Sequence, residues 1–192
     1  MTNKVKYNLK NVYYAKLTET VTSGVTTHTY ADPVRIPGAV SMSLDSEGSN
    51  DPFYADGAVY YRSITNNGYS GDLEVALIPE SFRTDILSES LDGAKVLIEK
   101  SDTAETNKFA LLFEFDGDAK AIRHALYCCT ASRPSIESET KEDTISPGTE
   151  TLSITADPRS DGLVKARTSD ETTAAAYDAW YESVHEPVAA GA

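Results

Sequence analysis

The residues best suited to chemistry in this chain are carboxylates close to one apolar strand pattern. Glu114, Asp116 and Asp118 stand at alternate positions, an arrangement that suggests a calcium loop or an acid–base pair. The calcium pattern is incomplete, because a further acidic ligand at the required spacing and a closing glutamate are missing. A glycosidase needs two facing carboxylates, and the sequence does not show that Glu74, Glu114 or Asp116 face one another. Asp-Gly at positions 116–117 is more typical of a hairpin turn.

The histidines and cysteines form no metal-binding or nucleophile motif. His28, His124 and His185 lie far apart in the sequence, without a His-x-x-x-His pair or a Cys-x-x-Cys. Cys128 and Cys129 are adjacent in a strand-like segment, so we expect their side chains to point to opposite faces and pack as small apolar groups. No phosphate-binding loop, dinucleotide fingerprint or Gly-x-Ser-x-Gly appears. The sequence therefore predicts a protein that is not an enzyme and takes no cofactor or metal.

Composition and charge limit the remaining classes. The chain has 192 residues, 40% of them apolar, which is ample for one domain with a sizeable core. Thirty acidic against 17 basic residues give a net charge of −13, which disfavours non-specific binding to DNA or to anionic membranes. Two interpretations of this acidity stay open: it keeps the protein soluble, or it lets a surface face a polyanion without binding it. No apolar run is long enough to span a bilayer and no signal peptide is recognisable, so we expect a protein made and kept in the cytoplasm.

Period-2 alternation predicts a chain built mainly of strands. The segments with this pattern are 8–17, 25–30, 38–44, 58–64, 72–77, 95–99, 109–115, 122–131, 150–156 and 163–168. In segment 38–44 we expect Val40, Met42 and Leu44 on one face. In segment 72–77 we expect Leu73, Val75 and Leu77 on one face. The pair 109–115 and 122–131 has the richest apolar face, so we place it at the centre of the core.

Two helices complete the expected domain. One begins at Pro79, with Phe82 and Ile86 at i, i+4 spacing, and the other covers 173–185. Because the strands arrive as hairpins and not as βαβ units, the sequence predicts an antiparallel β-sandwich or open barrel segment with one or two flanking helices. We expect a single domain over 1–192. The segments expected to extend from this domain are an N-terminal arm (about 1–8), a long acidic loop (about 45–56) and a C-terminal tail (about 186–192).

The order of several segments resembles one known family. The segments are Val5-Lys-Tyr-Asn-Leu-Lys-Asn-Val-Tyr-Tyr-Ala-Lys, Ile36-Pro-Gly-Ala-Val-Ser-Met-Ser-Leu-Asp, Phe53-Tyr-Ala-Asp-Gly, Gly71-Asp-Leu-Glu-Val-Ala-Leu-Ile-Pro, Phe109-Ala-Leu-Leu-Phe-Glu-Phe-Asp-Gly and Tyr177-Asp-Ala-Trp-Tyr. Together they cover nearly the whole chain, and they resemble the major tail tube proteins of long-tailed, non-contractile bacteriophages, chiefly those of Gram-positive hosts.

The resemblance implies a structural virion protein. Members of the family form hexameric rings that stack into a hollow tail tube, assembled in the host bacterial cytoplasm and carried in the virion. The implied partners are further copies of the chain, a tape measure protein and tail terminator and initiator proteins. DNA would pass through the lumen transiently without specific binding, and no membrane is involved. The C-terminal immunoglobulin-like domain of some members is not expected here.

On this interpretation, the arm, the loop and the tail make the contacts between subunits. The residues expected to do so are Lys4, Lys6, Leu9, Asp45, Glu47, Asp51, Phe53 and Tyr54. The alternative is a non-catalytic β-sandwich binding module for a carbohydrate or protein ligand, with Tyr54, Tyr60 and Tyr69 as its platform.

Overall fold

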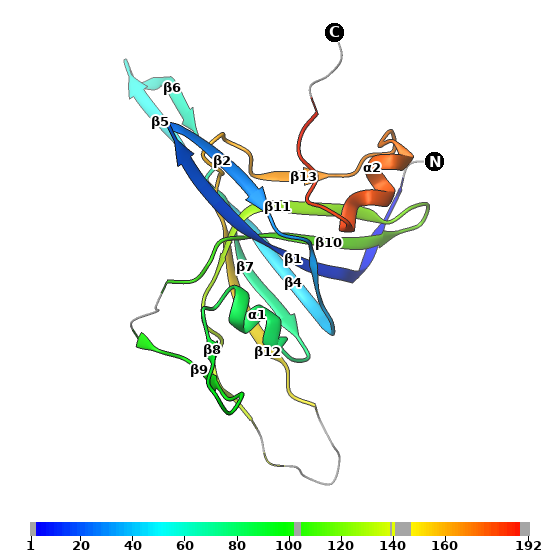
Figure 1. Cartoon of the computed structure of the whole chain (residues 1–192). Coiled ribbons are helices and arrows are strands. Elements are labelled where there is room, and N and C mark those ends of the chain that lie inside the picture. The colour runs from blue at the N-terminus through cyan, green and yellow to red at the C-terminus, as the bar shows by residue number, and fades with distance from the viewer. Residues whose placement is uncertain (1–2, 102–104, 139, 141–146, 189–192) are drawn as a thin grey trace.

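The protein is an antiparallel β-sandwich with short flanking helices, as the strand pattern predicts (Figure 1). The computed structural model describes residues 3–101, 105–138, 140 and 147–188. Within these ranges nine strands form one sheet, in the order β2-β1-β10-β11-β12-β7-β4, with β3 paired to β1 and β13 to β11. The bounds are β1 Lys6–Thr22, β2 Val25–Tyr30, β3 Val34–Ile36, β4 Ala39–Glu47, β7 Gly68–Val75, β10 Phe109–Gly117, β11 Ile122–Ala131, β12 Glu150–Ala156 and β13 Lys165–Arg167.

The remaining elements are small. Two separate pairs are formed by β5 (Asn50–Ala55) with β6 (Ala58–Ile64) and by β8 (Ser90–Leu91) with β9 (Leu97–Ile98). The helices are α1 (Glu80–Asp85), α2 (Ala174–Asp178) and the 3₁₀ turn η2 (Ala179–Tyr181). Among the described residues no helix is long and apolar enough to cross a membrane.

The sheet curls so that strands from distant places in its order share one core. The larger core cluster includes Val12 of β1, Leu73 of β7, Phe82 of α1, Leu111 of β10 and Ile154 of β12, all almost fully buried. Apolar side chains alternate along each of these strands, so one face of every strand can be withdrawn from water. The sheet thus forms both layers of the sandwich, and α1 packs against the same core (Figure 1).

A smaller core cluster lies on the other face of β1, β10 and β11. Ala15, Leu112, Tyr127, Trp180 and Val184 form it, so the C-terminal helical segment covers this face. The predicted alternation in β1 is confirmed, since Tyr14 belongs to the larger cluster and Ala15 to the smaller. The prediction that 109–115 and 122–131 form the centre of the core is confirmed as well: β10 and β11 pair directly and contribute to both clusters.

Four details of the predicted strands are wrong. A bulge between Ala39 and Ser41 turns Val40 outward to 53% exposure, while Ala39 packs on the core. Leu77 is 67% exposed because β7 ends at Val75, and Ile78 is buried in its place. The expected strand 95–99 is reduced to β9, and 163–168 to β13, which pairs with β11.

The turns and the second helix also differ from prediction. Gly117 is the last residue of β10, so the hairpin turn follows it. Pro79 occupies the N-cap position of α1, where its backbone is extended, so the first helical residue is Glu80. The second helix is shorter than 173–185: Thr173 caps α2, its hydroxyl accepting from the Ala176 N–H, and the chain continues as η2 to Tyr181.

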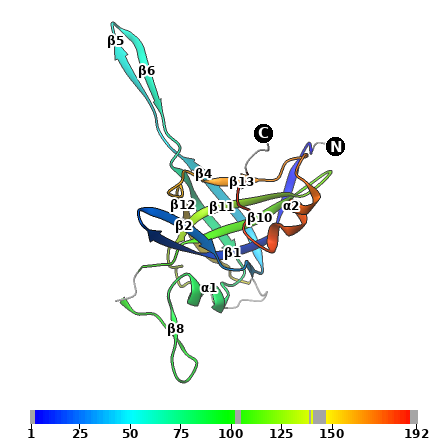
Figure 2. The same cartoon turned by 45° about the horizontal axis from the view of Figure 1, so that its top comes forward.

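The predicted loop 45–56 is wrong and is the largest correction. β4 continues to Glu47 and β5 covers most of the remainder, so the segment is the first half of a β-hairpin. Two bonds, Thr65 N–H to Ser49 O (3.0 Å) and Asn67 N–H to Glu47 O (2.9 Å), join this hairpin to the β4–β7 pair. Figure 2 shows it as a ribbon that projects far from the body of the sandwich.

Candidate functional site

The projecting hairpin, residues 49–65, carries the largest group of exposed apolar side chains on one element. Phe53 (61%), Tyr54 (63%), Tyr60 (76%), Tyr61 (64%) and Ile64 (74%) are all open to solvent. Among the described strands, β5 and β6 pair only with each other. A two-stranded ribbon is marginally stable in water, and apolar patches of this kind mark interaction surfaces. The hairpin is therefore a candidate interaction surface.

The hairpin turn has a sequence signal that explains its conformation. Asp56 (φ 51°) and Gly57 (φ 76°) both adopt positive φ, as a two-residue type I′ turn requires. Phe53 pairs across the ribbon with Tyr61, and Tyr54 with Val59. Asp-Gly between two aromatic runs was the available signal for this hairpin, but the many Ser, Asn and Asp residues before it favoured a loop.

A second candidate surface is an acidic, hydroxyl-rich face of β4, β7 and β12. Three rows cross it: Ser41–Glu74–Thr151, Ser43–Asp72–Ser153 and Asp45–Ser70–Thr155. We call these residues, with Glu47, the acidic face. None of the three strands contains a lysine or arginine. The opposite faces of the same strands supply Met42, Leu73 and Ile154 to the larger core cluster, so the acidic face must point outward.

Hydroxyl groups donate hydrogen bonds to two carboxylates of the acidic face, Glu74 and Asp72. Ser41 Oγ and Thr149 Oγ1 each donate to Glu74 at 2.7 Å, and Ser153 Oγ donates to Asp72 at 2.7 Å. The hydrogen bonds from Thr149 and Ser41 lower the pKa of Glu74 below its usual value. These hydrogen bonds therefore favour the charged form of Glu74.

The predicted contact residues fall into two groups. Asp51, Phe53 and Tyr54 are on the hairpin. Asp45 and Glu47 are on the acidic face, at the end of β4 that leads into the hairpin. The structure thus places these five predicted residues along β4 and the hairpin that follows it.

The other three predicted residues lie on the opposite part of the sheet order. The Lys4 N–H donates to Asp118 Oδ1 (2.7 Å), Lys6 is placed over the Phe115 ring, and Leu9 packs on the larger core cluster. The Asn3 side chain also bonds the turn after β10. The N-terminal arm is therefore fixed to the body from Asn3 onward, and residues 1–2 lie outside the described ranges.

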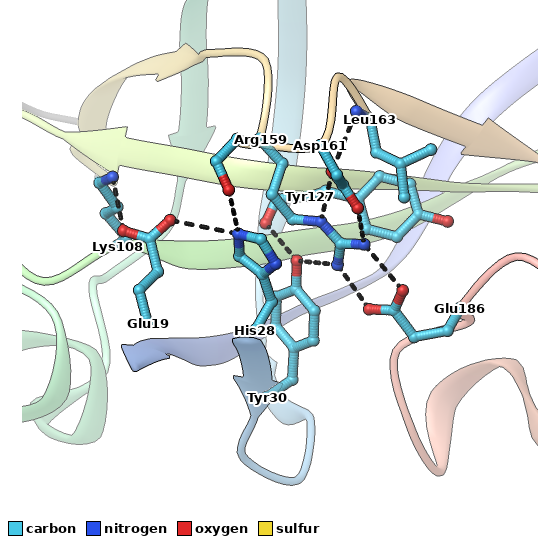
Figure 3. Close-up of polar contacts among 10 residues, drawn as sticks. Glu19, His28, Tyr30, Lys108, Tyr127, Arg159, Asp161, Leu163 and Glu186 are labelled. Carbon is cyan, nitrogen blue, oxygen red and sulfur yellow. Dashed lines mark hydrogen bonds and ion pairs between the residues drawn. The ribbon is translucent and has the colours of Figure 1, made fainter. Parts of the chain in front are cut away.

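The expected tail is anchored at its first residue by a buried arginine (Figure 3). The Arg159 side chain is 5% exposed and donates to Glu186 (2.6 and 2.9 Å), to Asp161 (2.7 and 3.0 Å) and to the Tyr30 hydroxyl (3.3 Å). This guanidinium lowers the pKa of Asp161 to about 2, and burial raises the pKa of Tyr30. The contact is structural, since it ties the C-terminal segment to β2; residues 189–192 of the tail lie outside the described ranges.

Glu114 and Asp116, two of the carboxylates considered for catalysis, form hydrogen bonds and ion pairs within the fold. Glu114 is buried and accepts from Arg123 (3.1 Å), Asn11 (2.7 Å) and the Tyr181 hydroxyl (3.1 Å). Asp116 pairs with Lys10 at 2.6 Å, at the edge of the same hairpin.

The described part of the chain contains no group of metal ligands, and its two cysteines are buried. There, no three His, Cys, Asp or Glu side chains are grouped to hold a metal. Cys128 and Cys129 are free and buried, and burial raises the pKa of both thiols. Cys129 belongs to the larger core cluster, where it packs as a small apolar side chain.

No known protein-family model matches this chain, and no curated protein matches its sequence.

Proposed function

We propose that this chain is a structural subunit that polymerises into stacked rings and forms the hollow tail tube of a long-tailed bacteriophage. The observation that carries the proposal is the projecting hairpin, whose exposed aromatic side chains need a partner surface. The tape measure, terminator and initiator proteins are its further partners, and it has no enzymatic activity. It is assembled in the host bacterial cytoplasm and resides in the virion. The ring of six follows from the family resemblance of the sequence segments.

Open sheet edges support the same proposal. Among the described strands, β2 and β4 end the strand order, so each leaves a row of backbone N–H and C=O groups unpaired. Monomeric proteins commonly protect such edges, because they recruit strands from other chains. A ring in which the β4 edge of one copy meets the β2 edge of the next would join the sheets into one wall.

The acidic face supplies the surface that a DNA conduit needs. The proposal assigns it to the lumen, where its carboxylates would repel phosphates and let DNA pass without binding. The absence of lysine and arginine from β4, β7 and β12 favours this assignment over a general solubilising role.

Negative-stain electron microscopy of the purified protein tests the proposal. We expect rings or hollow tubes roughly 100 Å wide, a few domain diameters, when the protein is concentrated over a range of salt. A variant with 50–64 replaced by Gly-Gly should fold, because the hairpin contributes nothing to either core cluster, but should not form tubes. Dispersed wild-type particles at every concentration, together with an unchanged sedimentation coefficient for the deletion variant, would contradict the proposal.

A second function is supported by the tyrosines of the hairpin. Tyr54 and Tyr60 are exposed as the binding-module alternative requires, whereas Tyr69 is half-buried and its hydroxyl accepts from Lys165 Nζ (2.6 Å). Aromatic rings on a projecting element suit stacking on a carbohydrate or a protein. A glycan-binding screen separates the two functions: saturable binding lost in Tyr54→Ala/Tyr60→Ala, without ring formation, would favour the binding module.

A further inference from the structure

A groove of about 330 Å³ opens beside β4, between the two layers of the sandwich. Its lining is largely aromatic and apolar: Leu44 of β4, Phe113 and Phe115 of β10, and His124 of β11. His124 stacks on Phe113 with ring centroids 5.0 Å apart, and Phe115 meets both rings edge-on. We call this feature the basic groove, because two lysines also line it.

The charge of the basic groove is opposite to that of the protein. Lys6 Nζ lies 5.0 Å from the centre of the Phe115 ring, and Lys165 Nζ lies 4.3 Å from that of Tyr69. Burial and these lysines, with Arg167, lower the pKa of His124, so its ring adds no charge of its own at neutral pH. An aromatic surface with two exposed ammonium groups suits a partner that combines aromatic and carboxylate side chains.

Residues 51–63 of the hairpin, which include its turn and which we call the tip, have that composition. Asp51 and Asp56 flank Phe53 and Tyr54, and all four are exposed. We propose that the tip of the hairpin of one copy docks in the basic groove of a second copy, with its aromatic rings on Phe113 and Phe115 and its aspartates beside Lys6 and Lys165. This inference rests on the proposed self-assembly and names the surfaces that meet.

The hairpin cannot fill the groove of its own chain. The six residues of β5 extend about 20 Å, and both views show the tip pointing away from the sandwich (Figures 1 and 2). A second copy is therefore the source of the tip. Since tip and groove are different surfaces, the contact is head-to-tail and allows continued assembly.

A charge swap tests the contact in the full-length protein. Asp51→Lys/Asp56→Lys and Lys6→Glu/Lys165→Glu should each raise the concentration needed for assembly by about tenfold or more, since like charges would meet at the contact. Mixing the two variants restores opposite charges and should restore assembly. Asp170→Lys/Glu171→Lys and Lys95→Glu/Lys100→Glu, which make the same changes in net charge at exposed positions elsewhere, are the matched controls. Swapped variants that assemble like these controls would overturn the proposal.

Cross-linking provides a readout that does not require tubes. Ala58→Cys, at the tip, is mixed with Met42→Cys, in the groove, one protein carrying a mass tag so that only intermolecular products count. We expect several-fold more mixed disulfide than with Lys95→Cys, which is exposed beside β9; equal yields would overturn the docking. Cys128 and Cys129 are buried and should not compete.

The two proposals can fail separately. Tubes without the Ala58–Met42 cross-link and without an effect of the charge swap would retain the tube and overturn the docking. The cross-link in a protein that never forms rings or tubes would support the docking and contradict the tube.

Discussion

At the scale of single residues, the buried polar side chains serve the fold. Arg159 and Glu114 each bind groups from distant parts of the chain, and both are almost fully buried with their partners in place. Removing one partner of such a group leaves a charge without compensation, so these positions tolerate little change. His124 differs, because burial and then the cations at the groove lower its pKa.

His124 should make the stability of the protein depend on pH. Burial first, then Lys165, Arg167 and Lys6, lower its pKa from 6.5 to about 4 in the folded state. As the pH falls from about 6.5 to about 4, the unfolded chain binds a proton here that the folded chain does not, so the free energy of unfolding must decrease. His124→Phe keeps the ring stack and removes the titration.

Urea denaturation at pH 7 and pH 4.5 measures the effect. The loss of stability on acidification should be smaller in His124→Phe than in the wild type by about 1–2 kcal/mol, after discounting for the partial exposure of the ring. Lys165→Met should give an intermediate result, because it removes one of the cations that lower the pKa. Equal losses in wild type and His124→Phe would show that this histidine titrates normally.

At the scale of elements, the sequence predicts a strand well where one face is buried. Segment 150–156 coincides with β12, whose burial alternates strictly because one face is buried. Segment 122–131 coincides with β11, which contributes to both core clusters and is marked by its apolar run. The second strand of the hairpin was also predicted, since segment 58–64 coincides with β6. Its first strand, β5, was not, because it is exposed and begins with the turn-forming residues Asn50, Asp51 and Pro52.

The candidate surfaces were predictable to different degrees. Asp45 and Glu47 were foreseeable as exposed acidic residues, but their alignment with Asp72 and Glu74 depends on which strands become neighbours in the sheet. The basic groove and the Arg159 contact join residues far apart in the chain, so no local pattern indicates them. The acidic face, the basic groove and the Arg159 contact depend on strand register and long-range pairing, which hydrophobic periodicity does not specify.

Gly71 should be essential to the pairing of β4 with β7. A Cβ on this residue would lie 2.0 Å from the Ser43 carbonyl oxygen, and its φ of 155° is unfavourable for other residues. Gly71→Ala must push β4 away from β7, which we expect to cost at least about 2–4 kcal/mol in thermal or urea unfolding.

Gly93→Ala is the control for this prediction. No atom lies within 4 Å of its ideal Cβ position, so its stability should stay within about 0.5 kcal/mol of the wild type. Similar unfolding midpoints for the two variants would mean that β4 and β7 can separate at little cost, contrary to their unbroken register over residues 41–47 of β4.

At the scale of the whole molecule, charge is distributed by surface. The net charge is −13, yet the basic groove carries Lys6 and Lys165 while β4, β7 and β12 carry no cation. A uniformly acidic coat would suffice for solubility, so this segregation favours surfaces with separate roles. In the proposed tube, the groove meets another copy and the acidic face meets the DNA.

Reversing charge on the acidic face should convert a repelling lumen into a binding one. In tubes of Asp45→Lys/Asp72→Lys, short duplex DNA should bind at about 50 mM salt and be released toward 200 mM, since each new phosphate contact is strongly salt-dependent. Asp170→Lys/Glu171→Lys makes the same change in net charge outside β4, β7 and β12 and is the control. Nuclease treatment locates the DNA. If the acidic face lines the lumen, DNA bound by the first variant is protected; if it lies on the outside of the tube, this DNA is digested. Digestible DNA, or equal binding by both variants, would exclude the acidic face from the lumen even if the tube itself forms.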